Sequence, residues 1–166
     1  MQTWQHAANR IRRSAGLDDY RPGLGQPMIP ANAVFVGSSD NRALAALLAA
    51  FDPVCVAQNL GGTVPRHVHG ADDPSTAAIL DYAVEDQGVS QFVVCGHADS
   101  AFVTPGAWQR DHALLPSQAH VLEQAERLRA YIDARHPSSS ASITIKALWL
   151  DDDGGQVCAF DLNTGQ

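Results

Sequence analysis

The chain of 166 residues has only three cysteines, few aromatic residues and no excess of basic charge. Cys55, Cys95 and Cys158 are widely spaced and form no Cys-x-x-Cys motif, so neither a disulfide framework nor a zinc ribbon is expected. We interpret them as buried thiols in a reducing compartment. A net charge of −7 opposes contact with a polyphosphate backbone, and no nucleic-acid partner is expected.

The sequence also lacks an apolar run of membrane-spanning length and a leader of the basic-then-apolar kind. We therefore expect a cytoplasmic protein without a membrane partner. With a mass of 17.7 kDa and 45% apolar residues, the chain has the size of one domain that buries a core without disulfides or a structural metal.

Short apolar runs that end in turn residues predict buried strands, and amphipathic runs between them predict helices. The expected strands cover 33–37, 53–60, 91–97, 142–150 and 156–162, and the expected helices cover 42–51, 75–88 and 117–136. Asp73 is placed to cap the second of these helices, and the Pro-Ser run after the third is expected to be a connector. The expected apolar faces are Ile79, Leu80, Ala83 and Val84 on the second helix and Leu122, Ala125, Leu128 and Ile132 on the third. This alternation predicts an α/β domain with a mainly parallel β-sheet flanked by helices and closed by a C-terminal hairpin.

The N-terminal segment differs from the rest in composition. Residues 1–14 have helical spacing, whereas 16–30 contain three prolines and three glycines, which predict an extended arm. We divide the chain into an N-terminal helix with an extended arm (1–30) and an α/β domain (31–166).

Polar loops follow two of the expected strands, GSSDNR at 37–42 and GHADS at 96–100. In parallel sheets, ligands bind beyond the carboxyl ends of the strands. The two loops are therefore expected to converge on one site.

These loops resemble the signatures of the β-class carbonic anhydrases, a Cys-x-Asp-x-Arg loop and a His-x-x-Cys loop. The chain has Ser38-Ser39-Asp40-Asn41-Arg42 in the first and His97-Ala98-Asp99-Ser100 in the second. Further stretches that resemble the family are VAQNLGGTVP at 56–65, ILDYAVEDQGVSQFVV at 79–94 and IKALWLDDDGGQVCAFDL at 145–162. The resemblance implies a β-carbonic anhydrase-like fold from about residue 30 to the end.

The resemblance also implies a zinc site, and at that site the chain departs from the family. Ser38 and Ser100 stand where the family has its two zinc cysteines, while His97 and Asp40 are kept. A serine hydroxyl is neutral near pH 7 and is a poor zinc ligand, so no zinc cofactor is expected. Without a metal-bound hydroxide, efficient hydration of carbon dioxide is not expected either.

The remaining site residues keep roles that the resemblance implies. Asp40 and Arg42 correspond to a catalytic dyad, expected here to be vestigial and to brace the loop. The former zinc site is expected to form a polar pocket from Ser38, Asp40, His97 and Ser100. The expected pocket wall comprises Gln58, which stands in the place of a family arginine, and Asn59, Gly61 and Gly62.

Three functions stay open on the sequence alone. The first is a pseudoenzyme with a binding, assembly or regulatory role. The second is an enzyme with a rebuilt metal site, in which His67, His69 or Cys95 joins the kept residues to hydrate carbon dioxide or a related small substrate. The third is a metal-independent enzyme acting on a small carbonyl or carboxylate compound, for example through a serine nucleophile that His97 activates and Asp40 orients.

The expected partners follow from the same resemblance and from the pocket. The resemblance implies a homodimer or a higher homo-oligomer, in which the N-terminal helix and the extended arm (1–30) are a dimerisation arm that embraces the neighbouring subunit. An active paralogue or a bicarbonate-using enzyme is a further candidate partner. A small anion or a carbonyl compound is the candidate ligand of the emptied pocket.

Overall fold

The structure is a computed structural model that describes residues 33–40, 55–66, 72–103, 114–151 and 156–160. The N-terminal helix and arm, the expected helix at 42–51, Arg42, His67 and His69 lie outside these residues. The side chain of Cys158 lies outside them as well.

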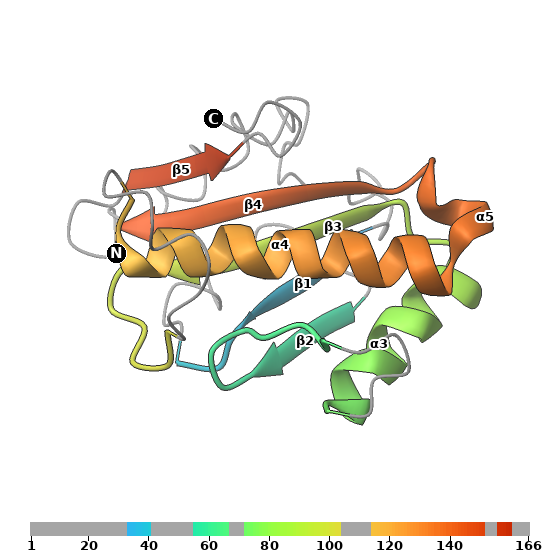
Figure 1. Cartoon of the computed structure of the whole chain (residues 1–166), viewed down its shortest axis with the longest axis horizontal. Coiled ribbons are helices and arrows are strands. Elements are labelled where there is room, and N and C mark those ends of the chain that lie inside the picture. The colour runs from blue at the N-terminus through green and yellow to red at the C-terminus, as the bar shows by residue number, and fades with distance from the viewer. Residues whose placement is uncertain (1–32, 41–54, 67–71, 104–113, 152–155, 161–166) are drawn as a thin grey trace, which may run out of the picture.

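The centre of the domain is a five-stranded sheet with the strand order β2-β1-β3-β4-β5 (Figure 1). Its strands are β1 (Ala33–Ser38), β2 (Cys55–Asn59), β3 (Gln91–His97), β4 (Thr144–Asp151) and β5 (Gln156–Phe160). The first four strands run parallel, and β5 pairs with β4 in the antiparallel sense. The mainly parallel sheet with a C-terminal hairpin that the sequence predicts is confirmed.

Three described helices accompany the sheet, namely α3 (Pro74–Glu85), α4 (Pro116–Arg135) and α5 (Pro137–Ser140). The predicted cap of α3 is present, because the Asp73 carboxylate accepts a hydrogen bond from the backbone N–H of Thr76 at 3.0 Å. The Pro-Ser run is a single helical turn rather than the expected connector. Pro137 favours the first turn of a helix, and the N–H of Ser140 bonds to the carbonyl of His136 at 3.0 Å.

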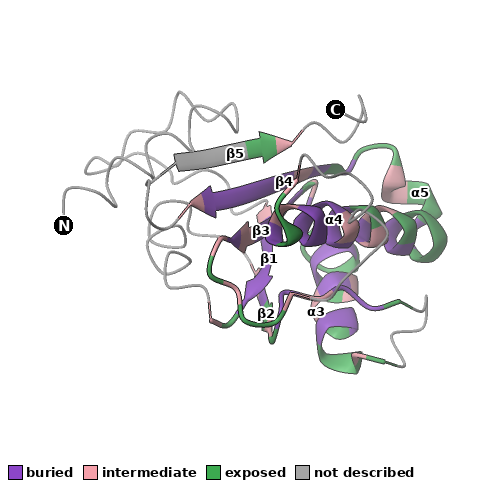
Figure 2. Ribbon diagram, turned by 60° about the vertical axis from the view of Figure 1, so that its left-hand side comes forward, coloured by how far each residue is buried: buried purple, intermediate pink, exposed green. Residues whose placement is uncertain are grey.

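The sheet is buried on both of its faces, as its continuous apolar runs predict. Alternate residues of β1, β3 and β4, such as Val36, Val94 and Ala147, pack with α3 and α4 in the main core cluster. The residues between them, such as Phe35 and Leu148, are also buried. Figure 2 shows that α4 turns a buried side to these strands and an exposed side away from them. Within the described part of the chain, no helix is both long and apolar enough to cross a membrane.

Candidate functional site

The ends of β1 and β3 place the two polar loops beside each other. The strands are parallel neighbours, with Gly37 paired to Cys95, so Ser38 and His97 both lie at the carboxyl edge of the sheet. Both side chains are buried, with 3% of each residue exposed. The convergence of loops predicted from the sequence is therefore present in the described residues.

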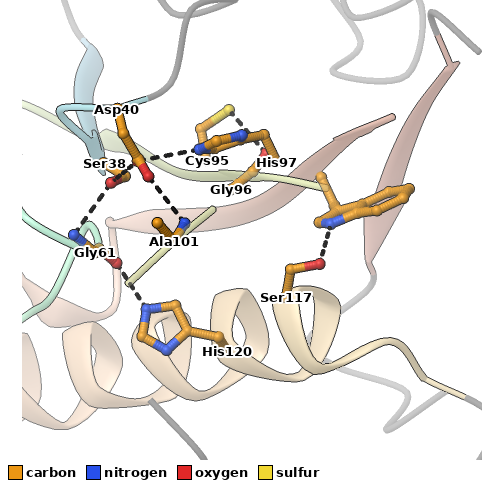
Figure 3. Close-up of polar contacts among 10 residues, drawn as sticks. Ser38, Asp40, Gly61, Cys95, Gly96, His97, Ala101, Ser117 and His120 are labelled. Carbon is orange, nitrogen blue, oxygen red and sulfur yellow. Dashed lines mark hydrogen bonds and ion pairs between the residues drawn. The ribbon is translucent and has the colours of Figure 1, made fainter. Parts of the chain in front are cut away.

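Asp40 lies at the centre of this edge and accepts three hydrogen bonds (Figure 3). The hydroxyl of Ser38 donates to Oδ1 of Asp40. Nε2 of His97 lies 3.1 Å from the same oxygen, and the backbone N–H of Ala101 donates to Oδ2 at 3.1 Å. One carboxylate thus joins the first loop to the second.

These contacts determine the charge of the Asp40 carboxyl group. Burial by itself would raise its pKa, but the hydrogen bonds from Ser38, His97 and Ala101 outweigh burial and lower the pKa below its usual value. Because an ionised carboxylate only accepts hydrogen bonds, Nε2 of His97 carries its proton in this arrangement. Both Ser38 and His97 therefore direct protons, not lone pairs, at the centre of the site.

A glycine pair after β2 closes the site from a third side. The backbone N–H of Gly61 donates to Oγ of Ser38 at 3.1 Å, which leaves the Ser38 hydroxyl with both a donor and an acceptor contact. Gly62 has a φ of +58°, and a Cβ there would lie 2.8 Å from the backbone nitrogen of Ser38. Only glycine fits this approach of two backbones without strain.

Helix α4 provides the last wall, because it approaches β3 very closely. A Cβ on Gly96 would lie 2.1 Å from Cγ2 of Val121, so this glycine permits the close packing of the helix on the strand. Nε2 of His120, on the same helix, lies 2.7 Å from the carbonyl oxygen of Gly61. In Figure 3, His120 points from α4 toward the glycine loop.

A small cavity lies between these walls, with a volume of ≈ 10 Å³. Its lining includes Ser38, His97 and Ser100 from the predicted site and Ser117, His120 and Gln124 from α4. A volume of this size is about what one water molecule needs. The cavity therefore has polar side chains in a mixed lining, but it is too small for a ligand of several heavy atoms.

The expected pocket wall is only partly brought to this cavity. Gly61 and Gly62 line it, whereas Gln58 is exposed and is not among the described lining residues. Asn59 is directed elsewhere, since its amide nitrogen lies 3.0 Å from both the Asp73 carboxylate and the Thr76 hydroxyl. Asn59 thus holds the loop to the start of α3.

Sequence reasoning missed the contribution of α4 to the site. The predicted apolar face of this helix included Leu122, Ala125 and Leu128, which are buried as expected. His120 and Gln124 of the same helix are buried as well, with 6% and 1% of each residue exposed. The available signal was their spacing, because residues three or four positions from the apolar stripe lie on the same side of a helix.

The order of contacts differs from a serine–histidine–aspartate relay. In such a relay the histidine lies between the serine and the carboxylate and removes the serine proton. Here Asp40 lies between Ser38 and His97 and contacts both. The three side chains are together, but the Ser38 hydroxyl donates its proton to the carboxylate and not to the imidazole.

The described residues are a poor match to zinc by the chemistry of their donor set. Two hydroxyls occupy the positions that thiolates hold in the family, and the facing nitrogen of His97 is protonated while it contacts Asp40. Cys95 lines the cavity, yet the described part of the chain contains no cluster of three or more histidine, cysteine or acidic side chains suited to a metal ion.

The fold and site together define an α/β protein whose polar centre lies where two parallel strands end. A family model described as carbonic anhydrase matches residues 33–147, which is more than half of the chain. The chain is 34% identical over 112 residues to a carbonic anhydrase of Pseudomonas aeruginosa, a match that covers 66% of this chain and 50% of that relative. The chain thus spans about half the length of this relative.

Solved structures agree with this match at the level of the fold. The wild-type β-carbonic anhydrase CafD of Aspergillus fumigatus superposes with a TM-score of 0.62 at 19% identity, covering 86% of this chain and 95% of that one. A tetrameric β-carbonic anhydrase of Sordaria macrospora superposes with a TM-score of 0.60 at 17% identity, covering 97% and 100%. The chain belongs to the carbonic anhydrase family, and its fold is that of the β class.

Proposed function

We propose that this chain is a β-carbonic anhydrase-like pseudoenzyme, which binds no zinc at the family position and serves assembly or regulation. The observation that carries the proposal is the hydrogen-bonding of Asp40. Its carboxylate accepts protons from Ser38 and from His97, so the kept family residues bind one another. Each of these contacts would have to break before a metal could be ligated.

The replacement of two thiolates supports the proposal through ligand chemistry. A cysteine on zinc is deprotonated and forms a short, strong bond, whereas Ser38 has its hydroxyl occupied by Asp40 and Gly61. Without zinc the water in the site keeps a pKa near its bulk value of about 15.7 rather than about 7. Asp40 acting as a general base would raise the hydration rate by about 10²- to 10⁴-fold, and it would leave the attacking water un-ionised.

The size of the cavity supports an assembly role over the binding of a small carbonyl compound or anion. Bicarbonate has four heavy atoms, whereas the cavity of ≈ 10 Å³ has room for about one water molecule. We therefore place the function on the surface of the domain and propose a homo-oligomer. The match to a β-carbonic anhydrase described as tetrameric, which covers 97% of this chain, supports that state.

The test measures metal content and turnover on the same sample. Protein purified without a histidine tag or chelator is analysed by plasma mass spectrometry for the metal-to-protein ratio, and by stopped flow for carbon dioxide hydration. We expect a ratio near zero and a hydration rate equal to that of buffer. One zinc per chain with rapid hydration would overturn the proposal and would favour a rebuilt site.

The assembly part of the proposal has its own measurement. Light scattering coupled to size-exclusion chromatography gives the mass of the particle in solution. A mass of at least twice 17.7 kDa supports the homo-oligomer, and a stable monomer at micromolar concentration would remove it.

A further inference from the structure

Two buried polar side chains of α4 line the cavity, and one atom of each has no partner among the described residues. Nδ1 of His120 and Nε2 of Gln124 are buried and have no hydrogen-bond partner among the described residues. Both residues line the same cavity and are spaced by four positions, so they lie on one face of the helix. Leaving a buried polar atom without a partner is energetically costly, which favours an occupant that contacts both atoms.

The existing hydrogen bonds of these two side chains determine whether each unpartnered atom is a donor or an acceptor. Nε2 of His120 faces the carbonyl of Gly61 at 2.7 Å, and a carbonyl only accepts, so Nε2 carries a proton and Nδ1 of that tautomer is an acceptor. Oε1 of Gln124 accepts from the backbone N–H of Val64 at 2.9 Å, which leaves Nε2 as a donor. The two side chains therefore offer one acceptor and one donor that have no partner among the described residues.

We propose that the cavity holds one buried water molecule, which donates to Nδ1 of His120 and accepts from Nε2 of Gln124. A water molecule offers both functions at once, and the cavity volume of ≈ 10 Å³ is about the minimum that it needs. An anion without a proton of its own would offer Nδ1 no donor, and bicarbonate, which has a proton, has more heavy atoms than the cavity admits. This site goes beyond the proposed function, because neither residue belongs to the former zinc set.

The water would complete a link between α4 and the glycine loop. His120 and Gln124 already contact the backbone of that loop at Gly61 and Val64. The backbone N–H of Gly61 in turn supports Ser38 at the centre of the site. The bound water thus fixes the helix face against the loop that shapes the cavity.

The test detects the water in the unmodified chain and then removes its donor. A crystal structure at atomic resolution should show one water within hydrogen-bond distance of both atoms. Water-to-amide nuclear Overhauser effects should give a long-lived water near the amides of Gly61 and Val64. The variant Gln124→Met keeps the length of the side chain and removes the donor, so this signal should be lost.

The control is Gln118→Met, the same change on the same helix. The carbonyl oxygen of the Gln118 side chain also accepts one backbone N–H, that of Leu115 at 3.0 Å, but this residue does not line the cavity. The long-lived water should persist in this variant. A dry cavity in the unmodified chain, a larger molecule there, a direct protein partner for either atom, or a water retained in Gln124→Met would each overturn the proposal. If Gln124→Met does not fold, the structure and spectra of the unmodified chain decide.

Discussion

The described residues contain two clusters in which a carboxylate contacts a buried histidine, and the two clusters have different surroundings. In the site, Oδ1 of Asp40 lies 3.1 Å from Nε2 of His97. Between the helices, Oδ1 of Asp81 lies 2.9 Å from Nε2 of His136. In both clusters burial acts to raise the pKa of the aspartate, and hydrogen bonds outweigh it and lower the pKa.

The helix cluster is a structural contact. Asp81 of α3 also accepts from the hydroxyl of Tyr131 at 2.9 Å and from the guanidinium of Arg135 at 3.2 Å, both on α4. Burial, and then the contact with Asp81, raise the pKa of Tyr131. In Figure 1 the end of α4 lies next to α3, where these residues join the two helices.

The difference lies in what surrounds each pair, not in the pair itself. Asp40 lies at the ends of two parallel strands beside a cavity, close glycine contacts and buried polar atoms of α4. Among the described lining residues of that cavity, none comes from the helix cluster. A carboxylate–histidine pair with a lowered aspartate pKa is therefore insufficient to mark a site. The strand ends and the cavity provide the distinction.

The largest expected effect comes from placing cysteines at positions 38 and 100, beside Asp40 and His97. In the double variant Ser38→Cys/Ser100→Cys, two thiolates join His97 and Asp40 at the strand ends, a ligand set that suits tetrahedral zinc. The zinc-to-protein ratio should rise from near zero to near one by plasma mass spectrometry. Each single variant is the matched control and should bind zinc much more weakly.

A double variant that stays metal-free would show that the loop backbone has departed from the family geometry along with its ligands. If the unmodified chain bound zinc to the same ratio, the cysteines would not be needed for metal binding, and the proposal of a metal-free site would be wrong. The two outcomes are separated by measuring all four proteins after the same purification.

The second-largest expected effect is a loss of stability when Gly62 of the glycine loop is replaced, compared with the same change at Gly88 outside the site. Gly62→Ala places a Cβ 2.8 Å from the backbone of Ser38 at a φ of +58°, whereas Gly88→Ala at a φ of +60° meets nothing within 4 Å. We expect a loss of unfolding free energy of about 3 kcal/mol at Gly62, from strain and overpacking together. At Gly88, strain alone should cost about 1 kcal/mol. Equal losses in urea unfolding would show that the backbone contact at Ser38 has no energetic role.

Much of this architecture follows from patterns in the sequence. The apolar runs predicted the described strands. The stripe Ile79, Leu80, Ala83 and Val84 predicted the buried face of α3, and all of these residues are buried except Ile79, which is half-buried. Those patterns are local, because burial repeats along one element. Ligands bind beyond the carboxyl ends of parallel strands, and this rule placed the two polar loops at one edge of the sheet. The strand order agrees, because β1 and β3 are parallel neighbours.

The details of the site depend on contacts between elements, which local patterns do not encode. His120 and Gln124 looked like ordinary polar positions of a helix, and only the close approach at Gly96 brings them to the cavity. Gln58 and Asn59 end β2, where successive side chains point to opposite sides, and Gln58 is exposed while Asn59 is turned toward α3. The alternation is local, but which of the two finds partners on α3 is decided by the packing of the elements.

The third effect tests the helix cluster through its pH dependence. Asp81→Asn should lower the unfolding free energy at pH 7 by about 2 kcal/mol, because three partners lose a charged acceptor. The pKa of Asp81 in the folded state lies below the usual value of 3.8, so its contribution is fully present above about pH 4. It is lost as the pH falls through the lower, folded-state pKa. The difference between the two proteins should therefore shrink below about pH 4 in urea unfolding, and a constant difference would contradict this account.

The smallest effect concerns Asp73, which links the glycine loop to α3 and thereby connects the two regions. Its carboxylate caps the helix at Thr76 and contacts the amide of Asn59 at 3.0 Å. Asp73→Ala should cost about 1 kcal/mol of unfolding free energy, and Asp73→Ser should recover most of it because serine also caps helices. If serine recovers nothing, the bond to Asn59 rather than the cap carries the stability. The glycine loop would then depend on α3 for its position, and α3 would stabilise both the site and the helix cluster.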